Sequence, residues 1–228
     1  MPGVELVVSR DAEEAAARAA ALLVEAARAG GALVLAGGST PRRAYELAAA
    51  AEPDWSRVEV WLGDERCVPP DDERANTRLV REALLERLAA APRFHPVATD
   101  RPAPEAAAAY DAELRGVRPT LALLGLGPDG HTASLFPDAA ALAERERRAV
   151  AAAPGLAPWV ERVTTTVPFL SSAAAVVFLA VGADKAEPAR RAFAGPPSPA
   201  TPASLVRSRA GRTLALLDET AAALLSSP

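Results

Sequence analysis

The sequence predicts an α/β protein in which helices cover both faces of a mostly parallel sheet. Short β-type runs alternate with helical stretches along nearly the whole chain. Some of these runs, such as Ala32–Ala36, are apolar at every position, which is typical of strands buried on both faces. Neither an internal repeat nor a clear linker interrupts the 228 residues. We therefore expect a single domain over residues 1–228, built as an α/β sandwich around the sheet.

The residues at the ends of the apolar runs set the limits of the expected elements. Asp11 suits the N-cap of an alanine-rich helix that reaches about Ala29 and ends at a Gly-Gly pair. Strands are expected at Val4–Val8, Ala32–Ala36, Val58–Leu62, Thr120–Leu124, Val163–Val167, Ala174–Val181 and Thr213–Leu217, with a short one at Phe94–Val97. Further helices are expected at Pro41–Ala51, Ala75–Ala89, Glu105–Arg115, Ala183–Phe193 and Asp218–Leu225, and loops at Ala153–Trp159 and Gly195–Pro202.

Composition excludes several classes of protein. The single cysteine, Cys67, rules out an internal disulfide and fits a reducing compartment. No apolar run reaches the ~20 residues of a membrane span, and the first residues lack the features of a signal peptide. A net charge of −4 leaves no general footprint for nucleic acid. We expect a cytoplasmic protein, a monomer or small homo-oligomer, that binds neither membranes nor nucleic acid.

The same composition makes the rare residues informative. Of the 25 basic residues only Lys185 is a lysine, and Asn76 is the only asparagine. Both run against a bias toward arginine and alanine, so we take them as candidates for a specific role, although chance survival stays open.

A glycine-rich loop follows the strand expected at Ala32–Ala36. Gly37 and Gly38 let the backbone approach a ligand closely, and Thr40 is expected to cap the next helix. Free amides at that helix start, with the hydroxyls of Ser39 and Thr40, would form an anion site. The loop lacks the lysine and the spacing of a Walker motif. An ordinary strand-to-helix turn remains an equal alternative from these residues alone.

A charged loop follows the strand expected at Val58–Leu62. Asp64 and Arg66 would point into the same crevice as the glycine-rich loop, because ligands of α/β sheets lie beyond the carboxyl ends of the strands. An arginine there can pair with a phosphate or stabilise an oxyanion. The alternative is a solvated loop. Cys67 as a nucleophile is disfavoured, since no histidine neighbours it in the sequence.

A third loop, Gly125–Ser134, follows the strand expected at Thr120–Leu124. Gly125, Gly127 and Gly130 match the GxGxxG dinucleotide pattern, but a nucleotide site is disfavoured, because the pattern lies mid-chain rather than in an opening βαβ unit and His131 follows it. Its turn presents Asp129 and His131 two residues apart, and a histidine oriented by a carboxylate is a common general base. His95, the other histidine, is interpreted as structural.

Two other kinds of site are not expected. Two histidines and one cysteine without close pairing do not make a zinc site. The GxSxG elbow of many serine hydrolases is absent from the sequence.

Taken in order, these segments resemble the 6-phosphogluconolactonase family. The resemblance spans most of the chain, and its DGHTASLFP stretch is highly specific. It runs through AGGST (Ala36–Thr40), LGDERCVP (Leu62–Pro69) with Asn76, LGLGPDGHTASLFP (Leu124–Pro137), RVTTT (Arg162–Thr166), GADKA (Gly182–Ala186) and PASLVR (Pro202–Arg207). It implies a Rossmann-like three-layer sandwich. It also implies hydrolysis of 6-phospho-D-glucono-1,5-lactone to 6-phospho-D-gluconate in the oxidative pentose phosphate pathway, with no metal and no cofactor.

The resemblance also implies roles for individual residues. His131 would act as the general base that activates water, and Arg66 would hold the substrate and stabilise charge at the carbonyl. Asp64 and Asp129 would orient the other groups. The substrate phosphate is expected on the glycine-rich loop and near two cations, namely Gly37, Gly38, Ser39, Thr40, Lys185 and Arg162.

Two other functions are weighed against the lactonase. The deaminases of the same superfamily resemble this chain at the Asp-Gly-His turn but carry a glutamate shortly after it, whereas Thr132–Pro137 contains no carboxylate. A sugar-phosphate sensor would bind without turnover, and such regulators carry a helix-turn-helix that this sequence does not show before its first strand. The sequence therefore favours the lactonase.

Overall fold

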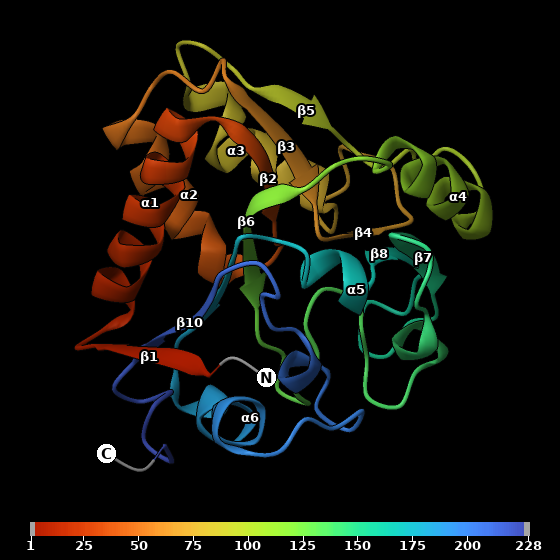
Figure 1. The fold of residues 1–228 in the computed structure, drawn as a ribbon. Helices are drawn as coiled ribbons and strands as arrows, with labels where there is room; N and C mark the ends of the chain where they lie inside the picture. Colours follow the sequence, from red (N-terminus) through yellow and green to blue (C-terminus); the bar gives the residue numbers. More distant parts are fainter. Residues whose placement is uncertain (1–2, 226–228) are drawn as a thin grey trace.

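A seven-stranded parallel sheet forms the centre of the protein (Figure 1), in a computed structural model that describes residues 3–225. Each neighbouring pair of strands is parallel, as the fully apolar runs of the sequence predict. The strands lie in the order β1 (Val4–Ser9), β10 (Arg212–Asp218), β9 (Ala175–Ala180), β6 (Pro119–Gly125), β2 (Gly31–Leu35), β3 (Val58–Leu62) and β5 (Arg93–His95).

Alternate side chains of the central strands enter two separate cores, one on each face of the sheet. Leu33 and Leu35 of β2 pack with α1 (Ala12–Ala29), α2 (Ser39–Ala51) and α3 (Asn76–Ala83). Val34 of the same strand packs in the other core, to which α4 (Ala103–Glu113), α5 (Val167–Leu170) and α6 (Ala186–Ala189) contribute. The predicted three-layer α/β sandwich is thus confirmed (Figure 1).

A second, smaller sheet lies on the face of the main sheet that carries α4. It is antiparallel, in the order β4 (Asp64–Arg66), β8 (Arg162–Thr165) and β7 (Ala149–Ala152). The sequence analysis expected neither β4 nor β7, because a strand of three or four residues carries too little periodic pattern. It also extended β8 to Val167, which instead begins α5.

The helix limits predicted from the sequence are right for α1, begin two residues late for α2, lie two residues late at both ends for α4, and run too long for α3. Asp11 caps α1 as expected, accepting a hydrogen bond from the backbone N–H of Glu14 at 2.8 Å. The helix expected at Ala75–Ala89 ends at Ala83 and is followed by a 3-10 turn at Leu85–Arg87.

The two helices expected near the C-terminus are also corrected. The segment expected as one helix at Ala183–Phe193 is divided into a 3-10 turn, the four-residue α6 and a π turn, and contains Pro188. The predicted helix at Asp218–Leu225 is wrong: Asp218 ends β10, and turns follow it up to residue 225.

The strand order places a crevice at one edge of the sheet. β2 and β6 are neighbours, but the chain continues from β2 to β3 on one side and from β6 to β9 on the other. The loops that leave these two strands therefore diverge, and an open space forms between them at the carboxyl ends. This is where two of the three loops singled out from the sequence emerge.

Two buried tyrosines form hydrogen bonds with the backbone at the carboxyl ends of β3 and β2, beside this crevice. Tyr110 Oη accepts from the N–H of Leu62 at 2.8 Å and donates to its carbonyl at 3.0 Å. These groups of Leu62 lie beyond the last residue of β3 that pairs with β5. Tyr45 Oη makes one such bond, to the carbonyl of Ala36 at 2.7 Å.

We expect Tyr110→Phe to lower the free energy of unfolding by about 1–3 kcal/mol, because it leaves two buried backbone groups without a partner. Tyr45→Phe removes a single bond and serves as the matched control with the smaller loss. Urea denaturation of the three proteins measures both effects. A loss in Tyr110→Phe no larger than that in Tyr45→Phe would contradict the prediction.

Candidate active site

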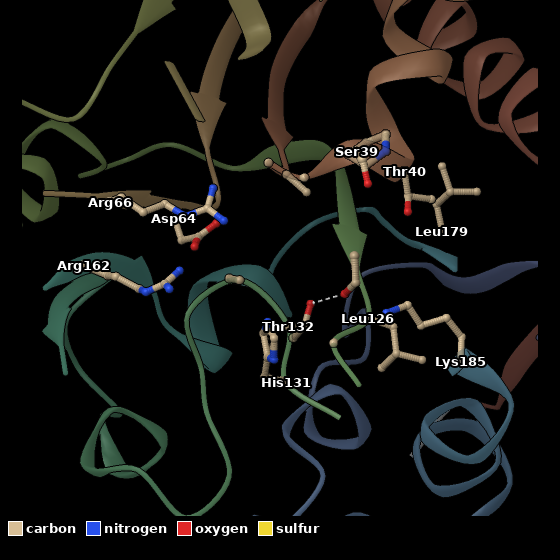
Figure 2. A pocket seen from close by; sticks show the side chains of 17 residues that line it. Ser39, Thr40, Asp64, Arg66, Leu126, His131, Thr132, Arg162, Leu179 and Lys185 are labelled. Atoms are coloured by element: carbon tan, nitrogen blue, oxygen red, sulfur yellow. Dashed lines mark hydrogen bonds between the residues drawn. The ribbon is translucent and has the colours of Figure 1, made fainter. Parts of the chain in front are cut away.

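A cavity of about 220 Å³ opens between the loops that follow β2 and β6 (Figure 2). Nine of the ten predicted site residues line it, namely Gly37, Gly38, Ser39, Thr40, Asp64, Arg66, His131, Arg162 and Lys185. The tenth, Asp129, is in contact with the ring of His131. The structure therefore brings together residues from five separate segments of the chain.

The loop after β2 presents the start of α2 to this cavity. Gly38 is the N-cap of α2, with φ +98°, and no side chain caps this helix end. The prediction that Thr40 is the cap is therefore wrong, since the helix already begins at Ser39 and Thr40 lies inside its first turn. Backbone N–H groups in the first turn of a helix have no intrahelical partner, so they are available to an anion in the cavity.

Lys185 reaches the cavity from the turn that follows β9. Its side chain is 17% exposed and its Nζ lies 2.9 Å from a carboxylate oxygen of Asp184. Asp218, at the end of β10, holds this turn: both of its carboxylate oxygens accept from the N–H of Gly182 at 3.1 Å. The sequence analysis did not find Asp218, because it appeared there only as the start of a helix.

Two arginines lie side by side on neighbouring strands of the small sheet. Arg66 of β4 and Arg162 of β8 are paired in the register, and both line the cavity. The buried Nε atom of each has no hydrogen-bond partner among residues 3–225. Burial, and then the neighbouring charge of Arg66, lower the pKa of Arg162. Two adjacent guanidinium groups with unused donors are suited to a shared anion.

Two features hold the ring of His131 in place. Its Nδ1 atom lies 2.5 Å from Asp129 Oδ1, which also accepts from the His131 backbone N–H at 3.0 Å. The ring packs on Phe136 at 4.8 Å between centroids, and a Cβ on Gly127 would overlap it. With Nδ1 engaged, Nε2 is the ring nitrogen left for a ligand. Which carboxylate contacts His131 could not be decided from the sequence, and in the structure it is Asp129.

Hydrogen bonds from His131 keep Asp129 acidic. Burial acts to raise the pKa of the Asp129 carboxyl, but the bonds from the His131 ring and backbone outweigh it and hold this pKa below its usual range. Asp129 is thus ready to act as a fixed acceptor for the imidazole.

Asp64 is buried at the wall of the cavity and fully hydrogen-bonded. Ser134 Oγ donates to its Oδ2 at 2.5 Å, and Asn76 Nδ2 donates to its Oδ1 at 3.1 Å. Neither Ser134 nor Asn76 was among the predicted site residues. Asn76 was noticed in the sequence as a rare residue type and as part of the family resemblance.

Glu65 is a second group that sequence reasoning did not assign. Its carboxylate accepts from the backbone N–H groups of Arg66, Asn76 and Thr77 at 2.7–2.8 Å. It therefore ties β4 to the start of α3. Burial raises the pKa of Glu65 in spite of these donors.

Two reactive residue types lie outside the cavity. Cys67 is half-buried, does not line the cavity, and has a thiol whose pKa is raised by burial, which gives no support to a nucleophile. His95 stacks on Trp61 with ring centroids 3.7 Å apart, in agreement with its structural interpretation.

Two further kinds of feature are absent from residues 3–225. We find no group of three or more His, Cys, Asp or Glu side chains suited to a metal ion in that range. None of the helices described is both long enough and apolar enough to cross a membrane.

The structure defines a parallel α/β protein with a cavity at its strand ends that is lined by Arg66, Arg162 and Lys185. The chain belongs to the family described as glucosamine-6-phosphate isomerases/6-phosphogluconolactonase, whose model matches residues 7–215. The resemblance found in the sequence is thereby confirmed.

Two relatives in this family are more than a third identical to the chain over the aligned residues. It is 38% identical over 204 residues to a 6-phosphogluconolactonase of Nostoc sp., covering 83% of this chain and 82% of the relative. It is 37% identical over 197 residues to the 6-phosphogluconolactonase of Homo sapiens, covering 81% and 76%.

Solved structures agree in fold. The 6-phosphogluconolactonase of Trypanosoma brucei superposes with a TM-score of 0.85 at 28% identity, covering 98% of this chain and 99% of that one. A monomeric glucosamine-6-phosphate deaminase superposes equally well, at 0.85, but at 17% identity. The fold alone therefore does not separate the two activities.

The lowered pKa of Asp129 predicts a pH dependence of stability. A carboxyl whose pKa is lower in the folded state stabilises the fold fully above its unfolded pKa of about 4, and this contribution is lost as the pH falls through the folded value. We therefore expect the free energy of unfolding of Asp129→Asn to fall less than that of the wild type between about pH 5 and pH 2.

The matched control is Asp138→Asn, which changes an exposed carboxyl with a left-handed φ of +54° that asparagine also adopts. It should follow the wild type over the same pH range in urea denaturation. If Asp129→Asn also followed the wild type, the carboxylate would not be stabilised by His131 in the way described.

Proposed function

We propose that this protein hydrolyses 6-phospho-D-glucono-1,5-lactone to 6-phospho-D-gluconate in the oxidative pentose phosphate pathway, with no metal and no cofactor. The observation that carries the proposal is the position of His131, held by Asp129, between two cationic groups of one cavity. Figure 2 shows Arg66 and Arg162 on one side of His131, and Ser39, Thr40 and Lys185 on the other.

In this proposal His131 is the general base. Its Nε2 takes a proton from a water molecule, and the resulting hydroxide attacks the lactone carbonyl. Asp129 holds Nδ1 and stabilises the imidazolium that forms. Collapse of the tetrahedral intermediate breaks the bond between the carbonyl carbon and the ring oxygen, and His131 returns the proton to that oxygen. The product is an open-chain hydroxy acid, which ionises to the carboxylate.

Arg66 is the proposed partner of the developing oxyanion. Its side chain lines the cavity beside Asp64, and its buried Nε donor has no partner among the described residues. A preorganised charged donor in a site of low dielectric stabilises the negative charge that appears on the carbonyl oxygen. Asp64 and the side chains bonded to it support this wall of the cavity.

The start of α2 is the proposed phosphate site. Gly38 leaves room for close approach, since nothing lies where its Cβ would stand, and the amides and hydroxyls of Ser39 and Thr40 supply donors. Lys185 supplies the cation beside it. Arg162 lies with Arg66 on the other side of His131 (Figure 2), so it faces the lactone end of the substrate rather than this phosphate site. These charges give a local positive pocket to a protein whose net charge is −4.

Two observations favour the lactonase over the deaminase. The two curated relatives described above, at 37% and 38% identity, are both named 6-phosphogluconolactonase, whereas the deaminase shares only the fold. The segment Thr132–Pro137 also offers no carboxylate after the histidine. A sensor that binds without turnover would not need a histidine held in this way.

The test is an assay on freshly generated 6-phosphogluconolactone. Product is followed through 6-phosphogluconate dehydrogenase, with spontaneous hydrolysis subtracted and glucosamine-6-phosphate assayed in parallel. We expect acceleration on the lactone alone. Ammonia released from the amino sugar, without lactone hydrolysis, would assign the protein to the deaminases, and binding without turnover would make it a sensor.

In the same assay His131→Ala should lower kcat by about 10²–10⁴-fold, because the general base is lost. Its dissociation constant for 6-phosphogluconate, measured by calorimetry, should change little. The control is His95→Phe, which keeps a ring against Trp61 and should retain activity. Substantial turnover by His131→Ala would remove His131 as the base.

Lys185→Met should raise KM by about 10–100-fold and leave kcat nearly unchanged, since a charge-assisted bond of about 1.5–3 kcal/mol to the phosphate is lost. Arg190→Met, which removes an exposed cation paired with Glu187, is the matched control for charge. An unchanged KM in Lys185→Met would place the phosphate elsewhere.

A further inference from the structure

Asn76, the first residue of α3, is almost completely buried beside the cavity. Only 1% of it is exposed, although its side chain is polar. Buried amides are retained only where their donors and acceptors are satisfied, so the partners of this side chain indicate what it does.

The two ends of the Asn76 amide are committed to different partners. Its Nδ2 donates to the carbonyl of Asp64 at 2.7 Å and to the carboxylate Oδ1 of the same residue at 3.1 Å. Its Oδ1 accepts from Nη1 of Arg66. The reversed amide would set N–H groups against a guanidinium and an oxygen against a carboxylate, so these partners define its orientation.

The backbone around Asn76 is fixed by a separate set of bonds. Glu65 Oε1 accepts from the N–H groups of Arg66 at 2.7 Å and Asn76 at 2.8 Å. The main chains of Arg66 and of Asn76 are thus held by one buried carboxylate, that of Glu65. This leaves the Arg66 side chain to be directed by the Asn76 amide.

Asn76 also contacts the glycine-rich loop. A Cβ added to Gly37 would overlap the Asn76 side-chain amide, so the backbone of that loop lies directly against it. Asn76 therefore touches both the wall that carries Arg66 and the loop that leads into α2.

We infer that Asn76 is a positioning residue for the reaction. Its Oδ1 anchors Nη1 of the Arg66 guanidinium, so that the rest of this group is presented to the cavity that Arg66 lines. Its contact with Gly37 sets the distance between this group and the start of α2. The inference rests on the proposed function only in the role given to Arg66.

The chemistry of the position explains why an amide is required. The side chain must donate to a carboxylate and accept from a guanidinium within a few ångströms. An aspartate of the same shape accepts from Arg66 but sets a second negative charge against Asp64. An alanine can neither donate to Asp64 nor accept from Arg66.

A double-mutant cycle tests this inference. We expect Asn76→Ala to lower kcat/KM by about 10²-fold, the effect of misplacing a catalytic group by about 1 Å. In an Arg66→Ala background the same change should cost less than about threefold, because there is no guanidinium left to position. Equal losses in both backgrounds, or a loss below threefold in the wild type, would overturn the inference.

The control for folding is Val80→Ala. Val80 is a residue of α3 that is fully buried in the core between this helix and the sheet, and its apolar side chain takes no part in the hydrogen bonds of Glu65 and Asn76. This variant should retain wild-type kcat/KM. Thermal unfolding of all variants shows whether Asn76→Ala is folded, and if it is not, the outcome is decided with Asn76→Asp.

Asn76→Asp carries a signature that a merely structural role would not give. The negative charge of Asp64 raises the pKa of the new carboxyl, and the protonated form of that carboxyl restores a donor to Asp64. We expect kcat/KM of this variant, relative to the wild type, to be highest at acidic pH and to fall as the pH rises. A ratio independent of pH would contradict the inference.

The order of Arg66 is also measurable without substrate. In ¹⁵N NMR spectra of the free protein, we expect a distinct Arg66 Nε–H signal, assigned by its loss in Arg66→Lys, that collapses toward the averaged arginine signal in Asn76→Ala. An unchanged signal would overturn the inference even if the wild type proved inactive on the lactone. An inactive wild type with this NMR change would overturn the proposed function alone.

Discussion

The pairing of β2 with β6 is the constraint on which the candidate site depends. These two parallel strands end at the same edge of the sheet, and the chain leaves them in opposite directions. Their loops then cannot pack on each other, and the space between them becomes the cavity. On one side stands the start of α2, which needs an acceptor for its free amides, and on the other the turn that carries Asp129 and His131. The location of the cavity therefore depends on the order of the strands and not on any one side chain.

Burial of cations is the second condition of the site. Arg162 is almost fully buried, and two carbonyls, of Leu156 and Pro158, accept from its Nη2 at 3.0 and 3.2 Å. Carbonyl dipoles compensate a buried guanidinium only in part, and its neighbour Arg66 adds repulsion. An anion between them would relieve both costs. The two guanidinium groups are thus in place to attract an anion before a ligand binds, which is the physical meaning of preorganisation.

Local sequence was sufficient for the parts of the fold that depend on local interactions. The limits of α1 follow from Asp11 and the glycines beyond it, and the Asp129–His131 contact joins residues two apart on one turn. The short strands β4 and β7 could not be predicted, because β-pairing with β8 rather than their own pattern creates them.

The supporting residues of the site were missed for a similar reason. Glu65 and Asn76 act on each other across a long turn, and Ser134 reaches Asp64 from another strand's loop. Sequence identifies such residues as charged or rare, but their partners are set by tertiary structure. Arg162 was found only through the family resemblance, and its place opposite Arg66 follows from the register of β4 and β8.

The charge balance of the cavity bears on turnover in the proposed reaction. Hydrolysis converts a neutral lactone group into a carboxylate, so the product carries one more negative charge than the substrate. A cavity lined by Arg66, Arg162 and Lys185 alone would hold the product more tightly than the substrate and slow its release. Carboxylates stand beside these cations, with Asp64 on the cavity wall, Asp129 against His131, and Asp184 2.9 Å from Lys185. In the proposed reaction these carboxylates lower the net positive charge that the product meets, without removing the donors that bind the substrate, and so favour product release.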